Sequence, residues 1–484
     1  MSGANSMADY WSTLDVDLHL TVDSGAGRRD GLERALREAI RDGRLAAGTR
    51  LPSTRTLAAE LGVSRGTVSA AFDQLIAEGH LVARQGSGTR VARTAGAVAA
   101  SHSTNHRRAE PVSIRHDLRS GSPDLSRFPT TAWLRAARSA LDRAPRDAFG
   151  YGDPRGRIEL RTALAEYLGR TRGVLATPDQ IVITTGVQQA LRLMGRVLAA
   201  SGNPVMAMED PYITQFHAAV RGSGPTVVPL PVDEDGAQVD RLNTAEFDGV
   251  HAAVVTPSHQ FPIGSTLSPA RRQELAAWAR AGHLVIEDDY DGEFRYDRQP
   301  VGAIQGIAPD DVVYLGSASK TLGPGLRLGW MVLPPRWVGP VTEAKLLADH
   351  HSETLGQLTL AELITSHGYD RHIRSSRLRY RRRRDLLADR LISRAGRPLT
   401  GFTLSGIAAG LHALVRLEPA GLSEAEVLTR ATEYGLAIHG LSDMWWSPAG
   451  TEHRPQAIVV GYGSPSDGAY PAALDALVRT LSWT

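Results

Sequence analysis

The chain has 484 residues, of which 42% are hydrophobic and 22% are charged, a composition typical of a globular protein with two or three domains. It contains no cysteine, which excludes disulfides, thiolate metal sites and a cysteine nucleophile, and we expect no metal site. No run of about 18 apolar residues is present and the N-terminus lacks the pattern of a signal peptide. We therefore expect a cytosolic protein that does not enter a membrane.

The small net charge of +2 conceals an uneven distribution of charged residues. Between Arg28 and Arg93 there are 12 arginines and no lysine, against 7 acidic residues. A compact segment with such a basic surplus is typical of modules that bind the phosphate backbone of nucleic acids.

The same segment has the pattern of a helix-turn-helix unit. Residues 31–45 place apolar side chains four positions apart, as an amphipathic helix does. Ser53 and Ser64 are expected to cap two further helices on either side of a tight turn, "GVS". The stretch "LVARQGSGTRVA" predicts a hairpin with a glycine-rich tip, and this order of elements favours a module whose second helix enters the major groove.

From about Gly31 to Ala92 the chain resembles the winged helix-turn-helix of the GntR family. The alternative from the residues alone is a solvated basic face on an ordinary helical subdomain. The resemblance implies that double-stranded operator DNA is a partner. It also implies that six residues contact the DNA: Arg55, Ser64, Arg65, Thr67, Gln85 and Gly86.

The domain boundaries follow from changes in composition. We expect a DNA-binding domain at 13–93, a linker at 94–114 that is small and polar, and one large domain at 115–484. The large domain alternates helical patterns with short apolar runs that end in polar loops, such as "QIVITTG", "HLVIEDDY" and "DVVYLGS". This alternation predicts an α/β fold with a mainly parallel sheet covered on both faces, and a ligand site at the carboxyl ends of the strands.

The stretch "VVYLGSASKTLGPGLRLGW" has the residues needed to hold a phosphorylated aldehyde cofactor. Lys320 can form a Schiff base, the hydroxyls of Ser317 and Ser319 lie close to it in sequence, and Arg327 can return to a phosphate through its planar guanidinium. Each feature alone is common, and it is their order and spacing that favours pyridoxal 5'-phosphate chemistry.

Two other segments complete this pattern. In "ITTGVQQAL" a glycine turn opens a helix, so that backbone N–H groups around Gly186, Val187 and Gln188 are expected to face an anion. In "VIEDDYDGEF" a strand ends with Asp288 and Tyr290, a carboxylate and a phenol from one turn.

With these residues the large domain resembles the fold-type I aminotransferases, and the whole chain is similar to the MocR/GabR subfamily of GntR regulators. The resemblance implies a mainly parallel seven-stranded sheet, a small α+β subdomain at about 370–484, and a homodimer. It implies that Lys320 is the Schiff-base lysine, Asp288 pairs with the pyridine nitrogen, Tyr290 donates to the ring oxygen and Tyr212 stacks on the ring. The phosphate would be held by Gly186, Val187, Gln188, Ser317, Ser319 and Arg327.

Three departures from the aminotransferase pattern bear on function. Phe261 and Ile263 stand in "QFPIG" where aminotransferases have "NPTG", and "EDPYI" leaves the placement of Tyr212 open. The arginine that clamps a substrate carboxylate is replaced at about Val459. Loss of this bidentate anchor removes charge pairing and orientation from an amino-acid substrate, which disfavours turnover.

A further segment, "RHIRSSRLRYRRRRDLL", has eight arginines between Arg371 and Arg384. They cannot all share one helix face. Several are expected to pair with acids or to face solvent, and the alternative is a second DNA-contacting surface.

We therefore expect a regulator rather than an enzyme. It would bind operator DNA and sense pyridoxal phosphate, as PdxR-type regulators of vitamin B6 genes do, or an amine or amino acid, through the aminotransferase-like domain. The first alternative is an active aminotransferase with an appended DNA module. The second is a repressor whose pocket is empty.

Overall fold

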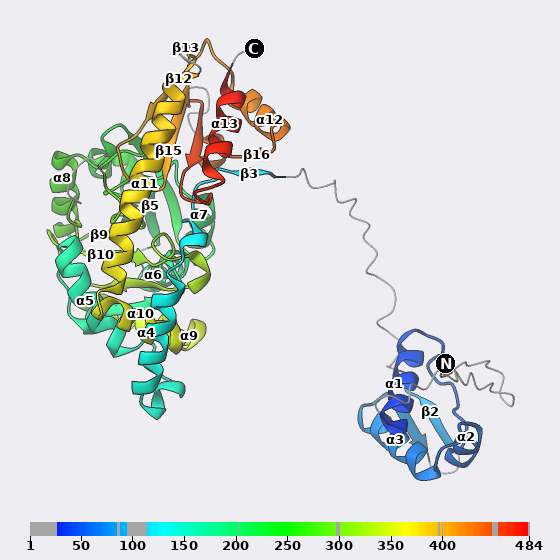
Figure 1. Ribbon diagram of the computed structural model, residues 1–484. Coiled ribbons are helices and arrows are strands. Elements are labelled where there is room, and N and C mark those ends of the chain that lie inside the picture. The colour runs from blue at the N-terminus through cyan, green and yellow to red at the C-terminus, as the bar shows by residue number, and fades with distance from the viewer. Residues whose placement is uncertain are drawn as a thin grey trace. The chain divides into compact units, whose positions relative to one another are not determined.

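The computed structural model describes residues 27–84, 88–93, 114–202, 204–296, 301–394, 397–398, 400–447 and 454–482. The chain forms two compact units, Met1–Pro111 and Val112–Thr484. Figure 1 shows the elements of both units, and each unit is described separately below. No helix in these described ranges is long and apolar enough to cross a membrane.

The described residues of the first unit form three helices and a pair of antiparallel strands: α1 (Arg28–Arg41), α2 (Thr54–Glu60), α3 (Arg65–Ala77), β1 (Leu81–Arg84) and β2 (Gly88–Val91). The predicted caps are present, because Ser53 accepts a hydrogen bond from the Thr56 N–H and Ser64 accepts one from the Thr67 N–H. Helix α1 ends before residue 45, at a turn in which Gly43 has a φ of 76°. Buried apolar side chains from all three helices form the core of the unit, which fixes α3 against α1 and α2.

The second unit is built on one large sheet in the order β4-β11-β10-β9-β8-β5-β6-β7. The strands are β4 (Ile181–Thr184), β5 (Val205–Asp210), β6 (Thr226–Asp233), β7 (Gly236–Ala237), β8 (Ala252–Val255), β9 (Leu284–Asp288), β10 (Val312–Ser317) and β11 (Gly329–Val332). Strands β10, β9, β8, β5 and β6 are parallel, and β11 is antiparallel to both neighbours. The sheet has one strand more than the seven expected, since the two-residue β7 extends its edge.

Helices cover both faces of this sheet. They are α4 (Thr130–Arg143), α5 (Ile158–Arg172), α6 (Val187–Ala200), α7 (Thr214–Arg221), α8 (Pro269–Arg280), α9 (Pro335–Asp349), α10 (Thr354–Thr365) and α11 (Gly368–Ile392). Strand β4 shows why two layers form: Ile181 and Ile183 join the core that contains α5, whereas Val182 joins the core that contains α6. Successive side chains of a strand point to opposite faces, so this fully apolar strand must be covered twice.

The C-terminal part of the unit adds a smaller sheet. Its strands, β14 (Phe402–Ser405), β15 (His412–Leu417), β18 (Ala457–Gly461) and β17 (His439–Gly440), pair antiparallel in that order. Two further strand pairs are β3 (His116–Asp117) with β16 (Leu436–Ala437) and β12 (Ser393–Arg394) with β13 (Arg397–Pro398). Helices α12 (Glu424–Glu433) and α13 (Tyr470–Leu481) also belong to this part, together with short 3-10 helices. Figure 1 shows α11 running along the unit from α10 to β12, so that it joins the two sheets.

Candidate functional site

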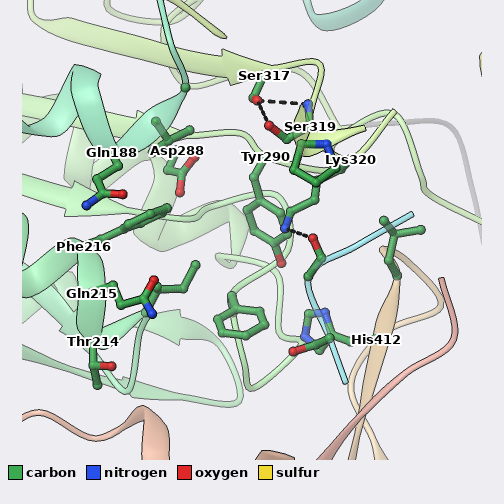
Figure 2. Close-up of a pocket in the computed structure, with 18 of the residues that line it drawn as sticks. Gln188, Thr214, Gln215, Phe216, Asp288, Tyr290, Ser317, Ser319, Lys320 and His412 are labelled. Carbon is green, nitrogen blue, oxygen red and sulfur yellow. Dashed lines mark hydrogen bonds between the residues drawn. The ribbon is translucent and has the colours of Figure 1, made fainter. Parts of the chain in front are cut away.

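A cavity of about 470 Å³ opens at the carboxyl ends of β9 and β10. Nine of the ten predicted cofactor-binding residues line it: Gly186, Val187, Gln188, Asp288, Tyr290, Ser317, Ser319, Lys320 and Arg327. Figure 2 shows the side chains of Asp288, Tyr290, Ser317, Ser319 and Lys320 gathered around this space. Segments about 140 residues apart in sequence therefore meet at one edge of the sheet, as expected for parallel strands.

Lys320 is one of only two lysines in the chain. Its ammonium nitrogen, Nζ, donates a hydrogen bond to the Gly121 carbonyl at 2.6 Å. Burial lowers the pKa of Lys320, and the nearby Asp291 and Asp288 carboxylates only partly oppose this effect. A lowered pKa increases the fraction of neutral amine, the form that attacks an aldehyde. The other lysine, Lys345, is fully buried on α9 with its Nζ 2.8 Å from Asp349.

One carboxylate oxygen of Asp288 has no hydrogen-bond donor among the residues that the structure describes. Its Oδ2 accepts a hydrogen bond from the Tyr212 hydroxyl, whereas Oδ1 is buried without a partner among the described residues. Burial raises the pKa of Asp288 to about 7; the Tyr212 hydrogen bond opposes this rise and the neighbouring Asp289 adds to it. A buried polar atom without a partner is costly. The arrangement therefore fits a ligand that brings an N–H donor, such as a protonated ring nitrogen.

An anion-binding corner lies at the start of α6. The N–H groups of Val187 and Gln188 belong to the first turn, where the helix offers no acceptor of its own. Gly186 precedes them with a φ of 124°, a conformation that L side chains rarely adopt, and a Cβ there would lie 3.6 Å from the Arg327 guanidinium. Among the described residues no carboxylate pairs with Arg327. Glycine thus lets an unpaired guanidinium approach a helix N-terminus, as a phosphate site requires.

The two serines of the stretch lie beside each other at the cavity wall. The Ser317 hydroxyl donates to the Ser319 hydroxyl at 2.8 Å, and the Ser319 N–H donates to Ser317 at 3.0 Å. Figure 2 shows this pair next to the Lys320 main chain. One hydroxyl can turn toward an anion while the other retains the local bond.

Tyr212 differs from the expectation that it stacks on a cofactor ring. It does not line the cavity; its side chain is buried behind Asp288, to which its hydroxyl donates. The backbone N–H of Tyr212 is bound by the Met444 carbonyl, which fixes this inward orientation. Phe216 on α7 lines the cavity instead, with its ring centroid 5.9 Å from that of Tyr212. The aromatic wall is therefore supplied four residues later than expected.

A buried pair behind Tyr290 was missed by sequence reasoning. The Tyr290 hydroxyl lies 3.3 Å from His259 Nδ1, which in turn lies 2.9 Å from the Asp291 carboxylate. Burial and the charges of Asp291 and Asp288 raise the pKa of Tyr290 well above its ordinary value, so its hydroxyl keeps the proton and remains a donor. The letters "SHQFP" and "YDGEF" contain this pair, but nothing in their spacing predicts the contact.

Val459 does not face the cavity. It lies in the middle of β18, fully buried between Leu414 and His439 of the neighbouring strands. Phe261 lines the cavity, whereas Ile263 does not and packs in the apolar cluster around it. Among the residues that line the cavity, Arg327 is the single arginine.

The predicted DNA-contacting residues of the first unit lie at its surface. Arg55 on α2 and Arg65 at the start of α3 are exposed, and no carboxylate in the described part of the chain pairs with either. The Ser64 and Thr67 hydroxyls lie 2.8 Å apart as part of the cap of α3. Gln85 and Gly86 lie outside the described residues.

The arginines of "RHIRSSRLRYRRRRDLL" divide between two environments on α11. Arg383 is buried and ion-paired with Asp124 at 2.7 Å and Asp467 at 2.6 Å. By contrast Arg371, Arg374 and Arg382 are exposed and have no carboxylate partner within the described ranges. The helix therefore uses arginine both for packing and for a solvated face, as its spacing predicts.

Comparisons with known proteins agree with this two-part organisation. Residues 28–91 match the family described as bacterial regulatory proteins, gntR family, and residues 116–440 match aminotransferase class I and II.

Three regulators resemble nearly the whole chain. The HTH-type transcriptional regulator YhdI of Bacillus subtilis is 32% identical, with 94% of this chain and 96% of the relative covered. The probable rhizopine catabolism regulatory protein MocR of Rhizobium meliloti is 33% identical, with 92% of each covered. The pyridoxine biosynthesis transcriptional regulator PdxR of Corynebacterium glutamicum is 31% identical, with 90% and 91% covered.

Solved aminotransferases resemble the second unit. The kynurenine aminotransferase of Pyrococcus horikoshii, solved with PMP, is 27% identical with a TM-score of 0.66, covering 75% of this chain and 90% of that one. An archaeal alanine:glyoxylate aminotransferase is 25% identical with a TM-score of 0.67, covering 76% and 90%.

The raised pKa of Asp288 predicts a pH dependence of stability. In the ligand-free protein this carboxyl keeps its proton to about pH 7, whereas in the unfolded chain it would lose it near its ordinary pKa of 3.8. Its protonation therefore favours the folded state at low pH, and this contribution is lost as the pH rises through about 7. Between pH 5 and pH 7 we expect the free energy of unfolding of Asp288→Asn to fall less steeply than that of wild type.

The difference in slope should approach about 1.4 kcal/mol per pH unit, the value for one proton. Above about pH 7.5 the two profiles should run parallel. Urea unfolding of ligand-free protein across this range measures both slopes, and parallel profiles from pH 5 to pH 7 would contradict the prediction.

Proposed function

Because the chain belongs to the MocR-type HTH transcriptional regulators, which join a GntR-family domain to an aminotransferase class I and II domain, we propose that it regulates transcription in response to pyridoxal 5'-phosphate. The cofactor would be held in the cavity around Lys320 and would act alone or with a small amine. The observation that carries this proposal is the buried, unsatisfied Asp288 oxygen beside a lysine of lowered pKa. A ring nitrogen and an aldehyde satisfy both groups at once.

Each part of the cofactor has a complementary group in the chain. When bound, pyridoxal phosphate supplies an aldehyde that reacts with amines and a ring that withdraws electrons. Lys320 would provide the reacting amine, Asp288 would hold a proton on the ring nitrogen, and Tyr290, oriented by His259 and Asp291, would donate to the ring oxygen. The phosphate would be held by Gly186, Val187, Gln188, Ser317, Ser319 and Arg327.

Enzymatic turnover is the second candidate function. The presence of Lys320, Asp288 and Tyr290 in one cavity favours it, while the lack of an arginine other than Arg327 leaves an amino-acid carboxylate without a second clamp. Steady transamination between an amino donor and a keto acid, abolished by Lys320→Ala, would support an enzyme. If no transamination is detected across a broad panel of amino acids, regulation of transcription is the one candidate function that remains.

A homodimer is part of the proposal. Tyr151, Leu346 and Leu347 are exposed apolar side chains, and the Tyr151 ring lies tilted against His350, one turn after Leu346, with 4.9 Å between ring centroids. Exposed apolar side chains can mark an interaction surface, and a second copy of the chain would cover these. Sedimentation equilibrium measures the mass, and a monomer at the concentrations that bind DNA would contradict the proposal.

We expect pyridoxal phosphate to change the affinity of the full-length chain for DNA from upstream of its own gene. A ligand shifts such an equilibrium only if it binds two states of the protein differently, and a coupling of 1–3 kcal/mol corresponds to roughly 5- to 150-fold. Fluorescence anisotropy with and without the cofactor measures the shift in wild type, and Lys320→Ala should abolish it. Equal affinities for loaded and cofactor-free wild type would remove the sensing role.

We expect Arg65 to contribute a phosphate contact. Arg65→Ala should weaken DNA binding and reduce the slope of log affinity against log salt by about 0.9. Arg374→Glu, at an exposed and unpaired arginine of α11, is the matched variant, for which we expect an unchanged slope. A flattened slope for Arg374→Glu would instead assign a second DNA-contacting surface to α11.

A further inference from the structure

The end of the cavity remote from Ser317 has few positive charges. Besides the residues around Lys320, polar side chains that line the cavity come from Thr214 and Gln215 on α7, His412 on β15, His439 on β17 and Asp443. Figure 2 shows Thr214, Gln215 and His412 at the opposite side of the space from Ser317. With Lys320 and Arg327 committed to the cofactor, no lysine or arginine among the lining residues remains to pair with a carboxylate.

His412 lines the cavity and has a ring nitrogen without a hydrogen-bond partner among the described residues. Its side chain is buried, and its Nε2 has no partner among the described residues. A hydrogen bond to the Pro262 carbonyl occupies the other ring nitrogen, which must therefore carry the proton. Burial and the neighbouring His259 lower the pKa of His412 well below its ordinary value, so the ring stays neutral. Nε2 thus requires a donor, which a carboxylate cannot supply.

The charged side chains at the cavity also disfavour a ligand with a carboxylate. Asp443, in the short 3-10 helix Ser442–Met444, is exposed at the cavity, and no cation in the described part of the chain is paired with it. Arg119, whose charge acts on the neighbouring His439, is held by both oxygens of Asp117, at 3.0 and 2.6 Å, and does not line the cavity. A ligand carboxylate at this end would meet a like charge, whereas an ammonium or a hydroxyl would not.

We propose that this end of the cavity binds a primary amine that carries a hydroxyl or a second amino group and has no carboxylate. The inference rests on the proposed function, because the ligand binds beside the cofactor. The Nε2 atom of His412 accepts the hydrogen bond from the hydroxyl or second amino group, and Asp443 favours a cationic ligand over an anionic one. An amino alcohol, an amino polyol or a diamine fits this description, and an amino acid does not.

The test is isothermal titration calorimetry on full-length protein loaded with pyridoxal phosphate. The probes are unbranched amines of two, three and four carbons, each ending in a hydroxyl, an amino group, a carboxylate or a methyl group. We expect the amino alcohol and the diamine of the best length to bind at least about tenfold more tightly than the amino acid of equal length. In His412→Phe the ratio of the affinity for the amino alcohol to the affinity for the methyl-ended amine should fall about fivefold.

Two further variants separate recognition from folding. His412→Gln keeps an acceptor and should retain most of the preference, and His283→Phe, outside the cavity, should retain all of it. Tighter binding of the amino acid, no binding of any amine, or an unchanged preference in His412→Phe would overturn the inference. If these results accompany a normal response of DNA affinity to pyridoxal phosphate, only the ligand class is wrong. If wild type does not take up the cofactor, the proposed function fails with it.

Discussion

The parallel pairing of β9 with β10 is the constraint on which the rest of the site depends. Leu315 lies opposite Asp288 in the register, so the chain leaves both strands at the same edge of the sheet. Asp288 and Lys320, 32 residues apart in sequence, are thereby brought to one cavity. Both groups are buried at this edge, and burial acts on their pKa values in opposite directions. It raises the pKa of Asp288 and lowers that of Lys320, so both shift toward their neutral forms.

A ligand that supplies the missing hydrogen-bond donor and the missing anion stabilises a site of this kind. Within the described part of the chain, Asp288 Oδ1 has no donor, Arg327 pairs with no carboxylate and the first turn of α6 has free N–H groups. A phosphorylated pyridine aldehyde supplies all three, which gives its binding a clear source of free energy. Such a ligand stabilises the arrangement of the chain that binds it. If that arrangement also has a different affinity for DNA, the ligand changes DNA binding without being turned over.

Local sequence patterns were sufficient for the parts of the site that lie within single segments. The capping serines, the apolar strands and the stretch around Lys320 each follow from spacing over a few residues. The sequence left the placement of Tyr212 open because its orientation is fixed by the distant Met444 carbonyl and by Asp288. The acceptor of His412 could not be predicted at all, since it depends on a bond to Pro262 on a loop about 150 residues earlier. Long-range contacts of this kind leave no periodicity in the sequence.

The composition of the chain makes one measurement especially direct. With only two lysines, of which Lys345 is fully buried against Asp349, reduction of cofactor-loaded protein with borohydride should fix pyridoxal phosphate at a single position. Peptide mapping by mass spectrometry should find the added group on Lys320 in wild type and nowhere in Lys320→Ala. Modification of Lys345, or none in wild type, would contradict the assignment of the cavity as the cofactor site.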